Sequence, residues 1–250
     1  MITTILTPDQ LDGIEAGSAQ GVIFDVLRAT TTIVTALGAG ATEIHLFDSL
    51  DGARAARSAW RSETGPVRLA GESKCLRPED FDLGNSPREM VTEKVGGATL
   101  LLSTTNGTRA AVRAKQAGIR TLFAASLLNA GATAKALIPR LDSGDTLLIC
   151  SGTAGKISLE DVLGAGTVLF SLLQATYRTD LAFTDTAWLA YHAFSAVRER
   201  LSAALRLGQG GLNVLGAGLE EDIDAAARLN SLEIVAPIES VGEGLVVRRK

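Results

Sequence analysis

The sequence predicts a layered α/β fold with a largely parallel sheet that is covered on both faces. Short apolar runs, typical of strands, alternate with helical patterns through most of the chain. Leu100-Leu-Leu and Leu147-Leu-Ile are apolar at consecutive positions, as central strands buried on both faces are. Parallel strands need crossover connections, which are usually helices, and the alternation supplies them.

The order of elements follows from apolar periodicity and turn residues. Strands are predicted at 21–26, 42–47, 67–70, 98–102, 119–123 and 145–149. Helices are predicted between them at 31–37, 50–60, 86–95, 107–117 and 129–141. Beyond Ser158, a plausible helix cap, the pattern is mainly helical: helices at 158–174, 184–207 and 219–229, a loop at 208–212, and small strands at 233–236 and 245–247.

Length and composition bound the domain organisation. With 250 residues and 46% hydrophobic content, the chain can bury a full core, either as one domain over 1–250 or with 158–230 as a helical second subdomain or oligomer surface. Neither alternative is favoured by a linker, because the sequence has no Pro- or Ser-rich stretch at these limits. A homodimer is the default expectation for a chain of this kind.

The charge and the cysteines limit partners and compartment. A net charge of −4 without a basic block argues against a nucleic-acid partner, whereas a small polyanionic ligand remains compatible. Cys75 and Cys150 are too few for a disulfide framework, which favours reduced thiols and a cytoplasmic protein. We expect no signal peptide at the N-terminus and no membrane span.

The stretch from residue 21 to 37 is the first candidate site. A predicted strand ends at Asp25, and a helix follows within Thr30–Thr32. The turn between them suits an anion or a metal ion, although simple helix capping by the threonines explains Thr30 and Thr31 equally well. Arg28 favours a functional role, because a cation near a helix N-terminus opposes the macrodipole unless an anion joins it.

Two other strands also end in hydroxyl-rich turns. Residues 99–107 and 146–154 read alike, each an apolar strand followed by small polar residues. Ligands bind at the carboxyl edge of open α/β sheets, so these turns are candidate substrate-binding segments, with helix capping as the structural alternative. The candidates are Thr104, Thr105, Asn106, Gly107, Thr108, Ser151, Gly152 and Thr153, together with Thr30.

Acidic residues near the same edge are candidate magnesium ligands. Mg²⁺ takes one or two carboxylates plus water and substrate oxygens, so only some of the acids can serve, and others are helix-turn charges. The candidates are Asp25, Glu72, Asp82, Glu160 and Asp161. Asn85 adds an amide oxygen beside Ser86, and Ser86, Pro87 and Glu89 have the order of a helix start.

Familiar catalytic patterns are absent from the sequence. The segment from Ser151 to Ile157 lacks the spacing of a nucleotide-binding phosphate loop, and Lys156 stands where cysteine phosphatases need an arginine. Cys150 therefore reads as a small buried residue. His45 and His192 have no partner at metal-ligand spacing, which favours structural roles.

Five blocks of the chain occur in a recognisable order: Asp25-Val-Leu-Arg-Ala-Thr-Thr-Thr, Gly71-Glu72, Phe81-Asp-Leu-Gly-Asn-Ser-Pro87, Thr104-Thr-Asn-Gly-Thr108, and Cys150-Ser-Gly-Thr with Leu159-Glu-Asp161. Together they resemble the 2-phosphosulfolactate phosphatase family, from about residue 21 to 166 and more weakly to the C-terminal strands. The resemblance implies a three-layer α/β/α fold and a Mg²⁺-dependent phosphatase. It implies hydrolysis of (2R)-O-phospho-3-sulfolactate, a step in coenzyme M biosynthesis.

Within that family the residues take expected roles. Asp25, Arg28 and Glu72 are the expected catalytic residues, with Arg28, Asn85 and Ser86 also facing the substrate. We expect direct attack by a water molecule, and the base stays open among Asp25, Glu72 and Asp82. A phosphoenzyme on Asp25 or Cys150 would contradict direct attack.

One departure from the family affects the substrate. The family usually has arginine after Gly-Glu, whereas Ser73 stands here, and Lys74 or Arg77 are possible substitutes. The alternatives are therefore a metal-dependent phosphatase for another phosphorylated small acid, and a non-catalytic anion-binding homologue.

Overall fold

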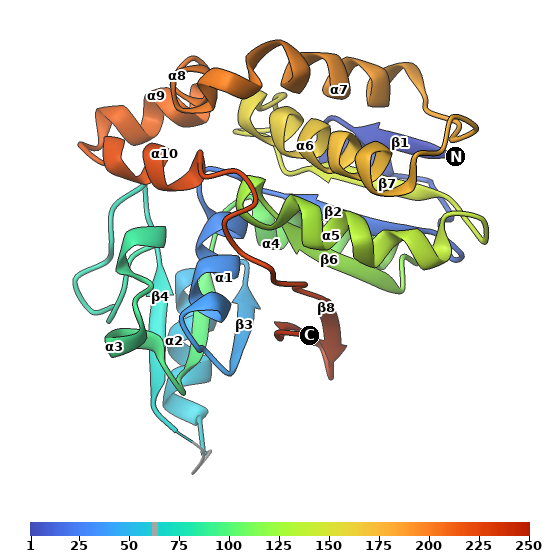
Figure 1. Cartoon of the computed structure of the whole chain (residues 1–250). Helices are drawn as coiled ribbons and strands as arrows, with labels where there is room; N and C mark the ends of the chain where they lie inside the picture. The colour runs from blue at the N-terminus through green and yellow to red at the C-terminus, as the bar shows by residue number, and fades with distance from the viewer. Residues whose placement is uncertain (62–64) are drawn as a thin grey trace.

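The computed structural model describes residues 1–61 and 65–250 and confirms the α/β class. The strands are β1 (Ile2–Ile5), β2 (Gln20–Phe24), β3 (Glu43–Phe47), β4 (Val67–Gly71), β5 (Thr99–Ser103), β6 (Thr121–Ala125), β7 (Thr146–Cys150), β8 (Ile238–Val241) and β9 (Gly244–Val247). They form two sheets, which lie at different orientations in Figure 1. Apolar periodicity identifies strands but does not encode which strands pair, so the sequence did not predict this division.

One sheet is entirely parallel and the other is mixed. The parallel sheet has the order β1-β7-β2-β6, and the mixed sheet has the order β4-β5-β3-β9-β8. In the mixed sheet β4, β5 and β3 are parallel, while β9 pairs antiparallel with both β3 and β8. The strands β2, β5 and β7, each of which has a strand paired on both sides, are wholly buried, which explains their continuous apolar runs.

Helices cover the sheets and also fill the space between them. The helices are α1 (Ala29–Gly38), α2 (Leu50–Ala59), α3 (Thr92–Val95), α4 (Gly107–Gln116), α5 (Ala130–Leu137), α6 (Leu159–Thr176), α7 (Asp185–Val197), α8 (Leu201–Leu205), α9 (Gln209–Gly216) and α10 (Glu220–Ala226). Side chains of α5, α6 and α7 share a core cluster with the parallel sheet, and α2 packs against the mixed sheet. The helices α5, α6 and α7 lie on one side of the parallel sheet in Figure 1.

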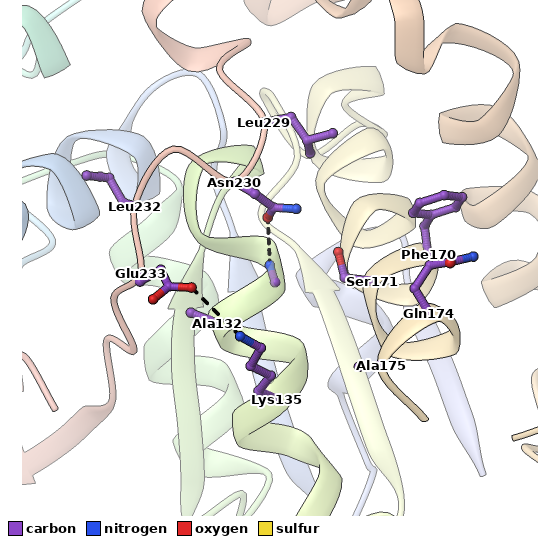
Figure 2. Close-up of a pocket in the computed structure, with 11 residues that line it drawn as sticks. Ala132, Lys135, Phe170, Ser171, Gln174, Ala175, Leu229, Asn230, Leu232 and Glu233 are labelled. Atoms are coloured by element: carbon purple, nitrogen blue, oxygen red, sulfur yellow. Dashed lines mark hydrogen bonds and ion pairs between the residues drawn. The ribbon is translucent and has the colours of Figure 1, made fainter. Parts of the chain in front are cut away.

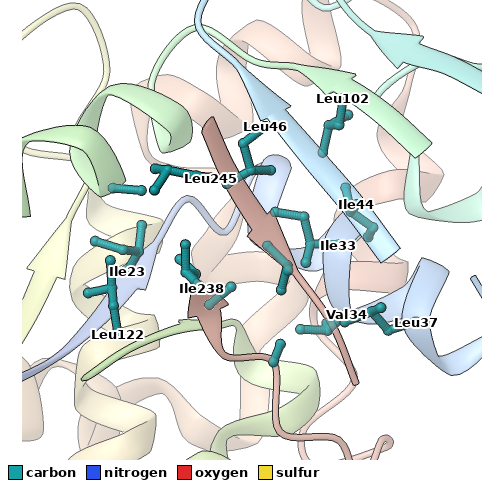
Figure 3. Close-up of a cluster of buried hydrophobic side chains, with 14 of the residues drawn as sticks. Ile23, Ile33, Val34, Leu37, Ile44, Leu46, Leu102, Leu122, Ile238 and Leu245 are labelled. Carbon is teal, nitrogen blue, oxygen red and sulfur yellow. The ribbon is translucent and has the colours of Figure 1, made fainter. Parts of the chain in front are cut away.

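The largest core lies between the two sheets and contains α1 and α4. Ile33 and Leu37 of α1 meet Ile23 of the parallel sheet and Ile44 of the mixed sheet in one cluster, which Figure 3 shows. Ala110, Ala111 and Ala114 supply the small inward face of α4. The parallel sheet therefore has helices on both faces, which is the three-layer α/β/α arrangement.

The two sheets are built from an interleaved repeat. The series β2-α1-β3-α2-β4 has the same element order as β5-α4-β6-α5-β7, and each of these strands has five residues. The first residue of β2 pairs with the first residues of β6 and β7, and the first residue of β5 pairs with those of β3 and β4. Each half thus supplies the middle strand of the other half's sheet. The two segments that look alike in the sequence, 99–107 and 146–154, contain β5 and β7, which are not equivalent strands of this repeat.

Several predicted boundaries were wrong. The predicted helix at 86–95 is a 3₁₀ turn, Pro87–Glu89, followed by the short α3, and the predicted loop at 208–212 belongs largely to α9. No strand forms at 233–236, and β8 begins at Ile238. The helix at 184–207 is divided into α7, a 3₁₀ turn and α8, while β1 was not predicted. In the described ranges no helix has the length and apolar character needed to cross a membrane.

Gly166 is expected to be intolerant of any side chain. It lies in α6, where an added Cβ would overlap Ala190 O and come within 2.7 Å of Phe194 Cβ, both in α7. We expect Gly166→Ala to lower the free energy of unfolding by about 1–3 kcal/mol, as overpacking does. The control is Gly216→Ala in α9, whose Cβ would meet nothing within 4 Å and which should not destabilise the protein. Urea denaturation of both variants measures the difference, and equal effects would contradict the close helix packing.

Candidate functional site

A cavity of about 390 Å³ lies where the carboxyl ends of β2, β4, β5 and β7 converge. Both middle strands of the interleaved repeat therefore deliver their turns to one place. The cavity is lined by Asp25, Leu27, Arg28, Glu72, Lys74, Cys75, Asn85, Thr104, Thr105, Asn106, Thr153, Ala154, Gly210 and Asn213. The turns that the sequence singled out thus meet at one cavity, although they come from two sheets.

Asp25 is held by the threonines that follow it. The Asp25 N–H donates to Thr30 Oγ1 at 3.1 Å, and Asp25 Oδ1 accepts from the Ala29 N–H at 3.2 Å. Thr31 Oγ1 donates to the Val26 carbonyl at 2.7 Å. The structural alternative, in which Thr30 and Thr31 cap the helix, is wrong, because α1 already begins at Ala29 and these hydroxyls fix the preceding turn.

The Asp25 carboxyl is a poised titratable group. It is only 7% exposed, and burial raises its pKa from 3.8 to about 6. The Ala29 and Gly107 amides oppose this effect, whereas the negative charges of Glu160 and Glu72 add to it. A carboxyl with a pKa of about 6 can both bind a cation and exchange a proton near neutral pH.

Glu72 links two walls of the cavity. It follows β4 directly, and its Oε2 accepts from the Cys75 N–H at 2.8 Å. Its Oε1 accepts from Thr105 Oγ1 at 3.1 Å, across from the end of β5. Both carboxylate oxygens are thereby oriented, and Glu72 faces the same cavity as Asp25.

Two matching tight turns contribute residues to the lining of the cavity. Ser73 and Leu76 exchange backbone hydrogen bonds of 2.8 and 3.1 Å, and Thr153 and Lys156 exchange two of 3.0 Å. The central residues all have positive φ: 52° and 69° at Lys74 and Cys75, and 51° and 73° at Ala154 and Gly155. This is the pattern of type I′ turns. The turns follow β4 and β7, which are equivalent strands of the repeat. Only the turn after β4 places a cation, Lys74, in the lining of the cavity.

Arg28 is almost completely buried at the cavity wall. Its Nη1 donates to Asp222 Oδ2 at 2.6 Å, and its Nη2 donates to the Cys75 carbonyl at 2.5 Å. Ser86 Oγ donates to the other Asp222 oxygen, Oδ1, at 2.6 Å. A guanidinium has five N–H donors, so donors remain for a ligand beyond these two bonds.

The cavity also offers groups suited to an anion. The N-termini of α1 and α4 both lie beside it, since Asp25 and Arg28 precede α1 and Asn106 precedes α4. Unpaired N–H groups and the macrodipole make helix N-termini favourable for anions. Asn85 offers a group of the opposite kind: it is 5% exposed, and its buried Oδ1, which has no hydrogen-bond partner among the described residues, is an acceptor suited to a cation or a hydrogen-bond donor.

The remaining predicted residues lie outside the lining. Asp82 is exposed and accepts from the Leu69 N–H at 2.8 Å, and the Asp161 oxygens accept from the Val26 and Gly152 N–H groups at 2.8 and 2.9 Å. Glu160 is buried against Gly208 and Gly210 behind the cavity wall. Ser86 does not cap a helix as predicted, because its hydroxyl is engaged by Asp222. Thr30, Ser86, Gly107, Thr108, Ser151 and Gly152 are likewise absent from the lining, although Ser86, Gly107 and Gly152 each adjoin a residue that belongs to it.

A magnesium ion fits the donor set of this cavity. Over residues 1–61 and 65–250, no group of three or more His, Cys, Asp or Glu side chains forms a metal cage. Mg²⁺ does not need one, because it binds through one or two carboxylates and keeps water and substrate oxygens as its other ligands. Asp25 and Glu72 are the carboxylates in the lining and meet this requirement.

Cys150 is unsuited to be a nucleophile. It is fully buried at the end of β7, and burial raises the pKa of its thiol well above the usual range. The thiolate, which is the reactive form, is thereby disfavoured.

Several lining residues were missed from the sequence. Gly210 and Asn213 lie in α9, whose glycine-rich start read as a loop. Asp222, which contacts Arg28 from outside the lining, lies in the helix predicted at 219–229 and was not a candidate site residue. Of the two substitutes for the missing arginine, Lys74 lines the cavity, whereas Arg77 Nη1 donates to the Asp82 carbonyl at 3.1 Å.

A second cavity, of about 370 Å³, lies between α5, α6 and the segment 229–233 (Figure 2). Its polar groups pair with one another: Lys135 Nζ lies 3.8 Å from Glu233 Oε1, and Asn230 Oδ1 accepts from the Gly131 N–H at 2.7 Å. Its lining has one carboxylate, Glu233, and one helix N-terminus, that of α5, whose Gly131 N–H already donates to Asn230. The first cavity has two carboxylates and two helix N-termini, and we therefore place the candidate active site there.

An α/β fold with carboxylates, cations and two helix N-termini at one cavity defines a class of proteins that act on small anionic molecules. Comparison with known proteins narrows this class. A family model described as 2-phosphosulpholactate phosphatase matches residues 5–240. The chain belongs to this family, and it is accordingly an enzyme of the phosphatase class.

Individual relatives agree with the family assignment. A protein of Cyanothece sp. is 37% identical over 92% of both chains. Proteins of Thermus thermophilus and Thermotoga petrophila are 35% and 36% identical, over 91% and 81% of this chain and 92% and 82% of their own. Each of these relatives is described as a probable 2-phosphosulfolactate phosphatase.

Proposed function

We propose that the chain is a Mg²⁺-dependent phosphatase that hydrolyses (2R)-O-phospho-3-sulfolactate to 3-sulfolactate and phosphate, the reaction type of coenzyme M biosynthesis. The observation that carries the proposal is that Asp25 and Glu72 face one cavity beside two helix N-termini. The names of the relatives support the substrate. A cytoplasmic location, a homodimer and the absence of a nucleic-acid partner stay predictions of the sequence.

The substrate carries phosphate, sulfonate and carboxylate groups, and the cavity has groups for all of them. Arg28 would donate its free N–H groups to phosphate oxygens, and the turn from Thr104 to Asn106 would donate hydroxyl and amide hydrogens. Lys74 would receive the sulfonate or the carboxylate. No ion pair engages Lys74 among the described residues, whereas Arg28 is already paired with Asp222.

Asp25 and Glu72 would hold Mg²⁺, whose charge neutralises phosphate oxygens in the transition state when the ion is bound. The proton of the attacking water would pass to a carboxylate of the cavity, for which Asp25 and Glu72 are the candidates because both face the cavity. A bond forms between the water oxygen and phosphorus, and the ester P–O bond breaks. The proton then goes to the alkoxide of sulfolactate, which leaves as the neutral hydroxyl.

A substrate panel tests the proposed function. Phosphate release should be fastest, by kcat/KM, with (2R)-O-phospho-3-sulfolactate, and EDTA should abolish it until Mg²⁺ is restored. A higher kcat/KM for another phosphorylated small acid would favour the alternative substrate, for which the replacement of arginine by Ser73 is the reason. Ligand binding without phosphate release from any ester would favour the non-catalytic anion-binding protein.

Lys74 is expected to determine the preference for an acidic substrate. Lys74→Met should raise KM for phosphosulfolactate about 10- to 100-fold, the cost of losing one hydrogen bond between charged groups. Hydrolysis of p-nitrophenyl phosphate, which has no second acid group, should change little. Arg77→Met is the matched control, because Arg77 donates to the Asp82 carbonyl instead of lining the cavity. Equal losses on both substrates would contradict this role of Lys74.

A further inference from the structure

We infer that Asp222 of α10 is a positioning residue of the active site, which holds Arg28 in the orientation that binds the phosphate group. The inference rests on the proposed phosphatase function and deepens it. It assigns a role to the C-terminal helices, which lie far along the chain from the strand ends that form the cavity.

The contacts of Asp222 carry this inference. Its side chain is 1% exposed, and its two oxygens have different partners: Oδ2 accepts from Arg28 Nη1 and Oδ1 accepts from Ser86 Oγ, both at 2.6 Å. One carboxylate thus joins α10 to the start of α1 and to the segment before the Pro87–Glu89 turn. Its neighbour Glu221 is 63% exposed and pairs with Arg88 on the surface.

The charges around Arg28 explain why it needs such a partner. Arg28 lines the same cavity as Asp25 and Glu72, and Cys75 joins two of these residues, because its carbonyl accepts from Arg28 Nη2 and its N–H donates to Glu72 Oε2. Arginine keeps its charge when buried, and a buried charge without a partner is strongly disfavoured. Without the Asp222 carboxylate, the guanidinium would turn toward Asp25 and Glu72 and fill the space meant for the substrate. Asp222 therefore keeps Arg28 available as a donor to an anion.

Binding and turnover of Asp222→Asn test the inference. We expect its affinity for inorganic phosphate, measured by calorimetry with Mg²⁺ present, to fall about 10- to 100-fold, and its KM to rise similarly. Glu221→Gln, the neighbouring acid in the same helix, should change neither quantity more than twofold. An unchanged phosphate affinity in folded Asp222→Asn would overturn the inference.

A double-mutant cycle separates positioning from a structural role. If Asp222 acts through Arg28, then Asp222→Asn should have little further effect on phosphate affinity once Arg28 is methionine. Additive effects would show that Asp222 acts elsewhere, and would overturn the inference. The doubly substituted Arg28→Met, Asp222→Met protein removes both charges together and should fold even if Asp222→Asn does not. Ser86→Ala, which removes one partner of Asp222, then supplies the intermediate loss of affinity.

The phosphate-binding measurement also separates this inference from the proposed function. If the wild-type protein binds phosphate but hydrolyses no ester, the proposed function fails, while the effect of Asp222 on binding is still measured. If the wild-type protein hydrolyses the ester and Asp222→Asn retains its KM and phosphate affinity, the inference alone fails.

Discussion

Replacing Asp25 by asparagine is expected to lower kcat of the phosphatase about 10²- to 10⁴-fold, the range for losing an acid–base group. Asparagine retains an oxygen that can accept from the Ala29 N–H, so the turn before α1 should survive. What is lost is the negative charge that would bind Mg²⁺ and accept the proton. Steady-state phosphate release, with a thermal melt to establish folding, measures the effect.

The matched control is Asp82→Asn. Asp82 was an equal candidate in the sequence, but it is exposed, accepts from the Leu69 N–H and does not line the cavity. We expect its kcat to stay within about threefold of wild type, because an asparagine oxygen can replace the single accepted bond. If Asp82→Asn lost activity and Asp25→Asn kept it, the assignment of the cavity as the active site would be wrong.

The metal-free protein is expected to become less stable as the pH rises from about 4 to 7. Burial raises the pKa of Asp25 to about 6, and it also raises the pKa values of Glu160 and Asp161. In this window the folded chain binds more protons than the unfolded chain, so the free energy of unfolding falls with pH. For Asp25, a pKa of about 6 instead of 3.8 corresponds to about 3 kcal/mol.

Urea denaturation at several pH values measures how the free energy of unfolding changes with pH. Asp25→Asn should remove the part of this change that Asp25 contributes. Asp80 and Asp180 have lowered pKa values, so they make the protein more stable as the pH rises, but only at pH values below this window. Both are exposed, so their contribution is small. Mg²⁺ should raise the free energy of unfolding at pH 8 and have little effect at pH 4.5, because its ligands must be ionised. If the metal-free protein became more stable between pH 4 and 7, this would contradict the raised pKa values of the buried acids.

The sequence predicted most strands and the turns that form the cavity, because each strand is an apolar run that ends at polar residues. Asp25, Glu72 and Thr104 each follow a strand, and this position alone brings them to a carboxyl edge. What the sequence did not predict depends on pairing between distant segments. The second sheet depends on which strands meet, and the burial of Asp222 depends on Arg28, which lies 194 residues away.

Local residue patterns also gave wrong predictions of helix caps and loops where tertiary contacts determine the structure instead. The threonines after Arg28 look like helix caps, but their hydroxyls bond to the preceding turn and to Asn85. Glycines at 208, 210 and 211 look like a loop, yet Gly208 and Gly210 leave the space that the Glu160 carboxylate fills. A Cβ at either position would collide with that carboxylate, so packing explains a composition that propensity reads as irregular.

The interleaved strand order has a consequence for synthesis on the ribosome. None of β1, β2, β3 and β4 pairs with another of these four; their partners are β5, β6, β7 and β9. A nascent chain that ends before β5 therefore cannot form either sheet, because the strands that pair with β1, β2, β3 and β4 have not yet been made. The N-terminal strands therefore cannot form a sheet before the later strands are made, although N-terminal parts usually fold first. The apolar strands β3 and β4 must stay unpaired until β5 has been synthesised, and β1 and β2 must wait for β6 and β7, so unpaired strands are exposed to chaperones during synthesis.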